Sequence, residues 1–182
     1  SIGEYWKGSF RTPSPVDLRM TVLTEDRAGS DWGFARWLPH VLQDDQLCRI
    51  GTDLHARTAL FTSIMQILDT RREVAQRDGL PLPIHVVVID GTHLVDTGEL
   101  TELLVHGPAH GIVCITLDER LAPEGVGATL VLASAIDTCS FQSRHQPRLD
   151  DVMVAGLSHG RADLAARTLA RLRPAMSEDQ GF

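Results

Sequence analysis

The chain has 182 residues, of which 43% are hydrophobic and 23% are charged, and its formal net charge is −7. This length suits one globular domain with a sizeable core, while the acidic balance argues against direct nucleic-acid binding, which requires a basic surface. No run of 18 apolar residues is present, so the sequence predicts no membrane span, and its first residues do not resemble a signal peptide.

The first part of the chain alternates between irregular, extended and helical patterns. Residues 1–15 are predicted to be irregular because they lead into the turn sequence TPSP. A strand is predicted over residues 16–24. A short helix capped at Ser30 and Asp31 is predicted to end at Pro39.

The longest predicted element follows a short strand at residues 47–51. Thr52 or Asp53 begins a helix whose apolar residues repeat at close to 3.6 residues as far as about Asp78. The elements predicted after it are a strand at 84–90, a helix at 98–106, strands at 112–117, 128–133 and 138–143, an extended segment near Val152 and a helix at 159–172. Residues 16–174 are predicted to form one domain, followed by a frayed tail at residues 175–182.

Two apolar strands, at residues 84–90 and 112–117, are separated by a single helix. This order predicts a βαβ unit with parallel pairing, and therefore an α/β fold with a mostly parallel sheet and helices on both faces. Ligands of such sheets bind beyond the carboxyl ends of the strands. Residues 24–26, 90–93 and 118–120 are therefore predicted to lie along one edge.

Asp90 ends the apolar strand IHVVVID and is the first candidate for a ligand-binding residue. In P-loop NTPases an aspartate at the end of a central strand holds the Mg²⁺ of a bound nucleotide. No G-x-x-x-x-G-K-[ST] loop occurs in the sequence, and Lys7 is its only lysine. Asp90 is therefore either a metal ligand or a strand-end residue that caps the following turn.

Residues 32–40, with the sequence WGFARWLPH, resemble the W-x-W/F-A-R-W-L-P-H signature of actinobacterial FtsK/SpoIIIE-type proteins. This family includes the motor ATPases of type VII secretion systems. The segments VVVIDG at 86–91, GPAHGI at 107–112 and LDERLAPE at 117–124 are also similar to the family. The resemblance covers roughly residues 16–174, and it implies a RecA-like, P-loop NTPase-type fold whose active members use ATP and Mg²⁺.

The sequence departs from active members of that family at the nucleotide site. Gly91 stands where a glutamate usually follows the aspartate, Asp118 stands where a glutamine often occurs, and residues 1–15 do not resemble a P-loop strand and helix. The resemblance thus implies a vestigial cofactor-binding region of Asp90, Gly91, Thr92 and Asp118, with Asp90 as the metal candidate. It implies no catalytic residue and no cofactor for this chain.

The resemblance implies a regulatory or scaffolding domain of a translocation motor for protein export or DNA transfer, without hydrolysis of its own. Its partners would be other ATPase domains of the same protein or ring and secreted helical proteins. Such a domain is expected in the cytoplasm, with membrane association through other parts of a larger protein. Two alternatives remain: an ATPase domain whose P-loop lies upstream of or is missing from this chain, and a stand-alone α/β protein-interaction module.

Five residues are candidates for contacts with partners. Trp32, Arg36 and Trp37 of the signature either form a docking surface or pack within the domain. Arg71 and Arg72 either reach the phosphates of a neighbouring subunit, as arginine fingers do, or form a solvated helix end that balances the helix dipole.

Overall fold

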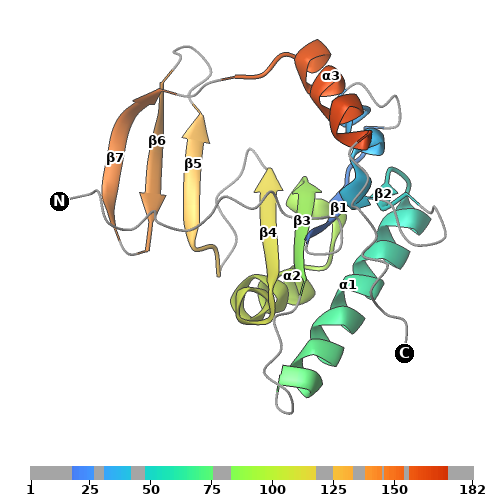
Figure 1. The fold of residues 1–182 in the computed structure, drawn as a ribbon. Coiled ribbons are helices and arrows are strands. Elements are labelled where there is room, and N and C mark those ends of the chain that lie inside the picture. The colour runs from blue at the N-terminus through green and yellow to red at the C-terminus, as the bar shows by residue number, and fades with distance from the viewer. Residues whose placement is uncertain are drawn as a thin grey trace, which may run out of the picture.

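A computed structural model describes residues 18–26, 31–41, 48–75, 83–117, 125–132, 138–144, 146–153 and 156–171. Its centre is a four-stranded, all-parallel sheet in the order β2–β1–β3–β4 (Figure 1). The strands are β1 (Leu18–Leu23), β2 (Ile50–Gly51), β3 (Ile84–Asp90) and β4 (Ile112–Leu117). The predicted α/β class with a parallel sheet is therefore confirmed, and the predicted order of elements agrees with the structure.

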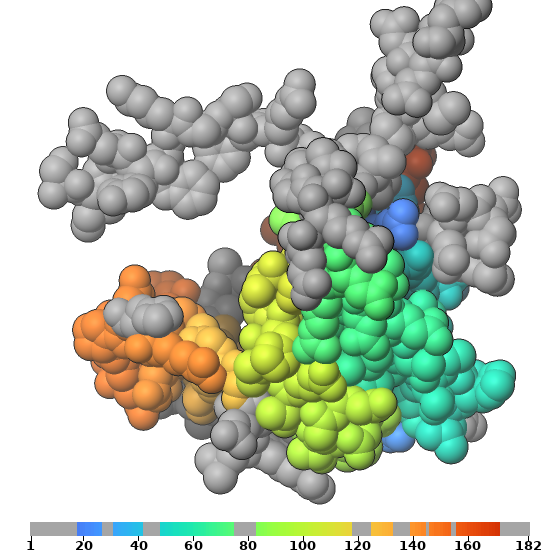
Figure 2. All heavy atoms as spheres, turned by 90° about the horizontal axis from the view of Figure 1, so that it is seen from below, coloured from blue at the N-terminus to red at the C-terminus, as the bar shows by residue number. Residues whose placement is uncertain are grey.

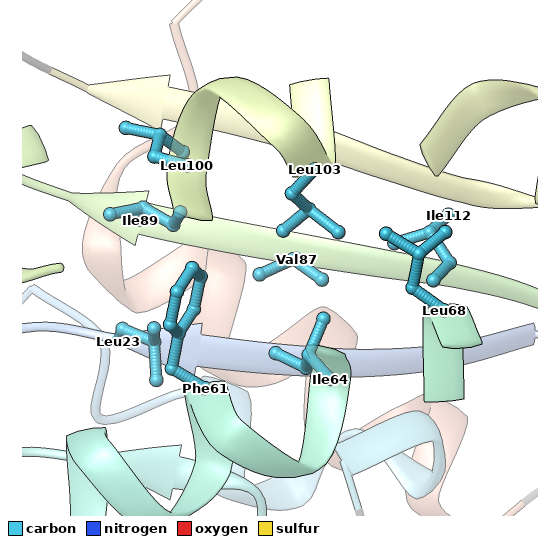
Figure 3. Close-up of a cluster of buried hydrophobic side chains, with 9 residues drawn as sticks. All are labelled: Leu23, Phe61, Ile64, Leu68, Val87, Ile89, Leu100, Leu103 and Ile112. Carbon is cyan, nitrogen blue, oxygen red and sulfur yellow. The ribbon is translucent and has the colours of Figure 1, made fainter. Parts of the chain in front are cut away.

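Two helices, α1 (Leu54–Ala75) and α2 (Thr97–His106), cover one face of this sheet. They bury the main core against the strands, as Figure 3 shows. Its nine residues are Leu23, Phe61, Ile64, Leu68, Val87, Ile89, Leu100, Leu103 and Ile112. The apolar residues of α1 repeat at the helical period, which places them on the side of the helix that packs on the sheet. The helix α2 begins at Asp96, whose carboxylate accepts the amide N–H groups of Gly98 and Glu99 at 2.9 and 3.0 Å. Residues 76–82, where α1 was predicted to end, lie outside the described residues.

The opposite face of β1 and β3 is covered by residues 32–40, which we call the aromatic block. Val22 and Val88 of the sheet and Ala35 of the block form a second buried cluster. The short helix predicted here is present as the 3₁₀ helix η1 (Ala35–Trp37), and a second 3₁₀ helix, η2 (Pro39–Val41), which was not predicted, follows it. The predicted cap residue Ser30 lies outside the described residues. The first helix ends before Pro39, as predicted, and Pro39 begins the second one. The shorter i→i+3 bonds place the large side chains of the block on the sheet.

The last three strands form a separate antiparallel sheet in the order β5–β6–β7, a pairing that was not predicted. Its strands are β5 (Ala128–Leu132), β6 (Thr138–Ser143) and β7 (Gln146–Met153). This sheet lies on the β4 side of the parallel sheet in Figure 1, and its orange atoms lie beside the yellow-green atoms of α2 in Figure 2. The final helix, α3 (His159–Ala170), packs on η1. Among the described helices, none is both long and apolar enough to cross a membrane.

Candidate functional site

The carboxyl ends of β1 and β3 lie side by side, as predicted for open parallel sheets. Leu23 and Ile89 are partners in the strand register, so the residues that follow them, Thr24 and Asp90, are neighbours. The hydroxyl of Thr24 is fully buried and donates to Oδ2 of Asp90 at 3.0 Å. Asp90 therefore lies where a sheet-edge ligand site was expected, with part of its carboxylate engaged by the neighbouring strand.

Trp32 of the aromatic block is the second donor to the same carboxylate oxygen. Its indole Nε1 donates to Oδ2 of Asp90 at 2.9 Å. Oδ2 of Asp26 accepts the amide N–H groups of Asp31 at 2.7 Å and Trp32 at 3.4 Å, which positions the start of the block. The indole also lies 6.0 Å from the Phe34 ring. Because an indole N–H can only donate, this bond uses Asp90 as an internal acceptor that ties the block to the sheet.

The backbone after Asp90 turns in a conformation that only glycine adopts readily. Gly91 has φ = 105°, and its amide N–H donates to the Leu117 carbonyl at 2.7 Å. A Cβ at this position would lie 2.7 Å from Cε1 of His93. Thr92 then begins the short helix η3 (Thr92–Leu94). The glycine is therefore required by the local geometry, which accounts for the absence of an acidic side chain next to Asp90.

Exposed charges surround this edge of the sheet. Glu25 lies 3.5 Å from Nη2 of Arg57 and 3.8 Å from Nε2 of His93. Arg57 is largely buried and donates through Nη1 to the carbonyl oxygens of Thr24 at 3.3 Å and Thr52 at 3.4 Å. Its role was not predicted. The sequence signal that could have indicated burial of Arg57 is its position on α1, four residues before Phe61 and therefore on the same buried face of the helix.

Trp37 lies away from Asp90, at the contact between the aromatic block and α3. The guanidinium carbon of Arg167 on α3 lies 4.2 Å from the centre of the Trp37 ring, and that of Arg36 lies 5.4 Å from it. Arg167 is held in place by Asp163, one helical turn earlier, at 2.6 Å. The predicted interaction residues Arg36 and Trp37 thus make a contact within the domain, in which cations stack on an indole.

Arg71 lies at the opposite, amino-terminal edge of the sheet. Its side chain is 8% exposed and donates three hydrogen bonds to backbone carbonyl groups. The acceptors are the carbonyl oxygens of His110 (2.8 Å), Gly111 (3.1 Å) and Pro83 (2.7 Å). Of the two alternatives left open for Arg71, the solvated helix end does not hold, because the side chain is buried. Arg72 bonds to Glu102 at 2.8 Å and joins α1 to α2 at the surface.

A buried histidine lies near Arg71 on the face of the sheet that α1 covers. His85 shares a 2.9 Å hydrogen bond through Nε2 with the hydroxyl of Thr21. Burial, followed by the positive charges of Arg49, Arg71 and Arg19, lowers the pKa of His85 to about 4. His85 is therefore neutral near pH 7, which makes it a structural residue at this pH.

The predicted site residues thus fall into separate groups. Asp90, Gly91, Thr92 and Trp32 come together at the carboxyl edge, whereas Trp37 and Arg71 do not belong to it. Asp118 lies outside the described residues. Within the described ranges, no group of three or more His, Cys, Asp or Glu side chains is placed to hold a metal ion.

The fold and this edge define the chain as an α/β domain with a parallel sheet and a strand-ending acidic residue bonded to a tryptophan. No protein-family model matches the chain, and no curated protein matches its sequence.

Proposed function

We propose that this chain is a non-hydrolysing domain of an FtsK/SpoIIIE-type translocation motor, which acts through contacts with other domains of the motor. The observation that carries the proposal is the position of Asp90. It ends a central parallel strand, as the Mg²⁺-holding aspartate of a P-loop NTPase does, but its Oδ2 accepts both the Trp32 indole and the Thr24 hydroxyl. The carboxylate thereby stabilises the fold.

The neighbouring backbone supports the same conclusion. In an active site of this kind, a general base next to the aspartate raises the reaction rate by a factor on the order of 10²–10⁴. The φ of 105° at Gly91 and the His93 ring beside it disfavour an acidic side chain at this position. The proposed partners are the other ATPase domains of the same protein or ring, and secreted helical proteins.

Calorimetry with Mg-ATP tests the proposal directly. The chain should show no binding heat at millimolar nucleotide, and the Asp90→Asn variant should behave in the same way. Co-purification with other ATPase domains of the motor is the positive result. Micromolar binding of Mg-ATP, or an ATPase rate that falls on Asp90→Asn, would refute a non-hydrolysing role.

A second candidate function is an ATPase domain whose P-loop segment lies outside this sequence. One observation favours it: among the described strands, β4 pairs only with β3, so no described strand bonds to its other edge. Micromolar Mg-ATP binding by a longer polypeptide, with none by the present chain, would support this candidate over the first.

A further inference from the structure

The amino-terminal edge of the parallel sheet gathers positive charge on the face that α1 covers. Arg19 of β1 and His85 of β3 are partners in the strand register. They lie on the same face as Thr21, whose hydroxyl is 2.9 Å from Nε2 of His85, because side chains alternate along a strand. Arg71 of α1 reaches the same place: its Nη1 and the amide N–H of His85 both donate to the Gly111 carbonyl, at 3.1 and 2.8 Å.

A third arginine reaches this face from the other side of β1. Arg49 immediately precedes β2 and is 8% exposed. The next residue, Ile50, packs against the buried cluster on the opposite face, so Arg49 lies on the α1 face. The charges of all three arginines contribute to the low pKa of His85. We call Arg19, Arg49, Arg71 and His85 the basic cluster.

Two arginines of the basic cluster have no carboxylate bonded to them among the described residues. Arg71 donates to backbone carbonyl oxygens, and Arg19, which is half-buried, makes no hydrogen bond or ion pair within the described ranges. Burial, followed by the charge of Arg19, lowers the pKa of Arg71. Nδ1 of His85, whose side chain is 1% exposed, is also without a partner in this part of the chain. Neighbouring cations removed from water cost stability unless an anion offsets them.

The donors that remain fit an oxyanion with several oxygens. A guanidinium group donates from a planar fork that matches two oxygens of a phosphate or a carboxylate. Arg71 donates three hydrogen bonds to carbonyl groups, and a guanidinium carries five N–H groups, so both Arg71 and Arg19 keep donors. A carboxylate is filled by one such fork, whereas a phosphate presents further oxygens to a second arginine.

We propose that the basic cluster is a binding site for a phosphate-class oxyanion, held by Arg19 and Arg71 at the amino-terminal edge of the sheet. Arg49 contributes its charge, and His85 lies beneath the anion as a buried neighbour. The site lies at the edge opposite Asp90, whereas nucleotides of α/β sheets bind at the carboxyl edge. The proposal therefore does not depend on whether this chain binds ATP.

Thermal unfolding with about 20 mM phosphate, at constant ionic strength and about pH 7, tests the site. For a Kd of about 1 mM the melting temperature of the parent should rise by about 5 °C. In Arg19→Gln only the non-specific stabilisation by phosphate, about 1 °C, should remain. Arg161→Gln, which removes the same charge at an exposed site on α3, is the matched control and should keep the full rise.

Two other probes identify the form of the anion. O-phosphoserine should match inorganic phosphate if the site accepts a phosphoryl group attached to a partner, and should give a smaller rise if the site takes the free ion. Acetate, the probe for a carboxylate, should leave the melting temperature unchanged. An equal rise with acetate would overturn the assignment to a phosphate-class anion, and an equal phosphate effect in the parent and Arg19→Gln would overturn the site.

Titration of His85 by nuclear magnetic resonance provides a readout that needs no variant of the arginines. Sulfate keeps its charge as the pH falls, and its binding should raise the pKa of His85 from about 4 by about one unit, because a nearby anion favours the imidazolium. His85→Gln identifies the resonances. An unchanged titration would overturn the proposal. Micromolar Mg-ATP binding that Arg19→Gln leaves intact would refute the proposed function alone, so the two proposals can fail separately.

Discussion

Replacing Asp90 by alanine and by asparagine separates its role as an internal acceptor from its charge. Both donors, the Trp32 indole and the Thr24 hydroxyl, bond to the same oxygen, Oδ2. An asparagine carbonyl in that place can accept both hydrogen bonds and loses only the charge. Alanine removes the acceptor and leaves the indole N–H without a partner.

The size of the two effects follows from the kind of hydrogen bond that is lost. A hydrogen bond to a charged group contributes about 1.5–3 kcal/mol, and Asp90 is only half-buried, so the lower value applies to each bond. The alanine variant should then lose about 3 kcal/mol of unfolding free energy, and the asparagine variant about 1 kcal/mol. For a chain of this length the corresponding falls in melting temperature are about 9 °C and about 3 °C.

Thermal unfolding of purified proteins at pH 7 measures both variants. Asp69→Ala is the matched control, because it removes an aspartate that is 67% exposed and paired only at the surface with Arg72. It should melt within about 2 °C of the parent. An alanine variant as stable as the asparagine variant would refute the acceptor role. An asparagine variant more stable than the parent would indicate a carboxylate retained for a ligand.

Three further variants test other parts of the structure. Between about pH 6.5 and 4 the unfolded chain binds a proton that folded His85, with its pKa of about 4, does not bind, so the folded state loses stability as the pH falls. The His85→Gln variant lacks this proton uptake. From pH 7 to 4.5 the free energy of unfolding of the parent, measured in urea titrations, should therefore fall by about 2–3 kcal/mol more than that of the variant. A parallel pH dependence of parent and variant would contradict this. Trp37→Ala should cost about 3 kcal/mol because it removes the ring on which Arg167 stacks, and melting within a degree of the parent would show that the ring is not a structural contact. Arg71→Lys should lower the free energy of unfolding by about 2 kcal/mol, because an ammonium group cannot donate to the same three carbonyl oxygens as the planar guanidinium. An unchanged midpoint in chemical denaturation would refute this.

Local sequence patterns were sufficient to predict most elements of the fold. The apolar run of β3 and the helical period of α1 reflect burial of one strand and of one helical face, which a sequence shows directly. The apolar pattern did not show that Arg57 and Arg71 are buried, because a buried arginine that bonds to backbone carbonyl groups looks like a surface residue in the sequence. The short helix before Pro39 was predicted, but its 3₁₀ type and the second helix at Pro39–Val41 were not, because they depend on packing on the sheet.

The candidate site could be predicted only in part. The parallel order of β1 and β3 was enough to place residues 24–26 and 90–93 at one edge. The bond between Trp32 and Asp90 joins residues 58 positions apart, and no local pattern encodes it. The separate sheet of β5, β6 and β7 is a similar case, since strand propensity identifies the strands but tertiary contacts choose their partners.

The turn after Asp90 also limits how this domain can change over generations. A mutation of codon 91 to an acidic residue would meet two obstacles at once, the positive φ and the ring of His93. Evolution toward a paired acid at this place would first need a smaller residue at position 93 and a rebuilt turn. A single mutation of codon 91 is therefore a poor source of a paired acid, so descendants of this chain would tend to keep the aspartate without an acidic neighbour.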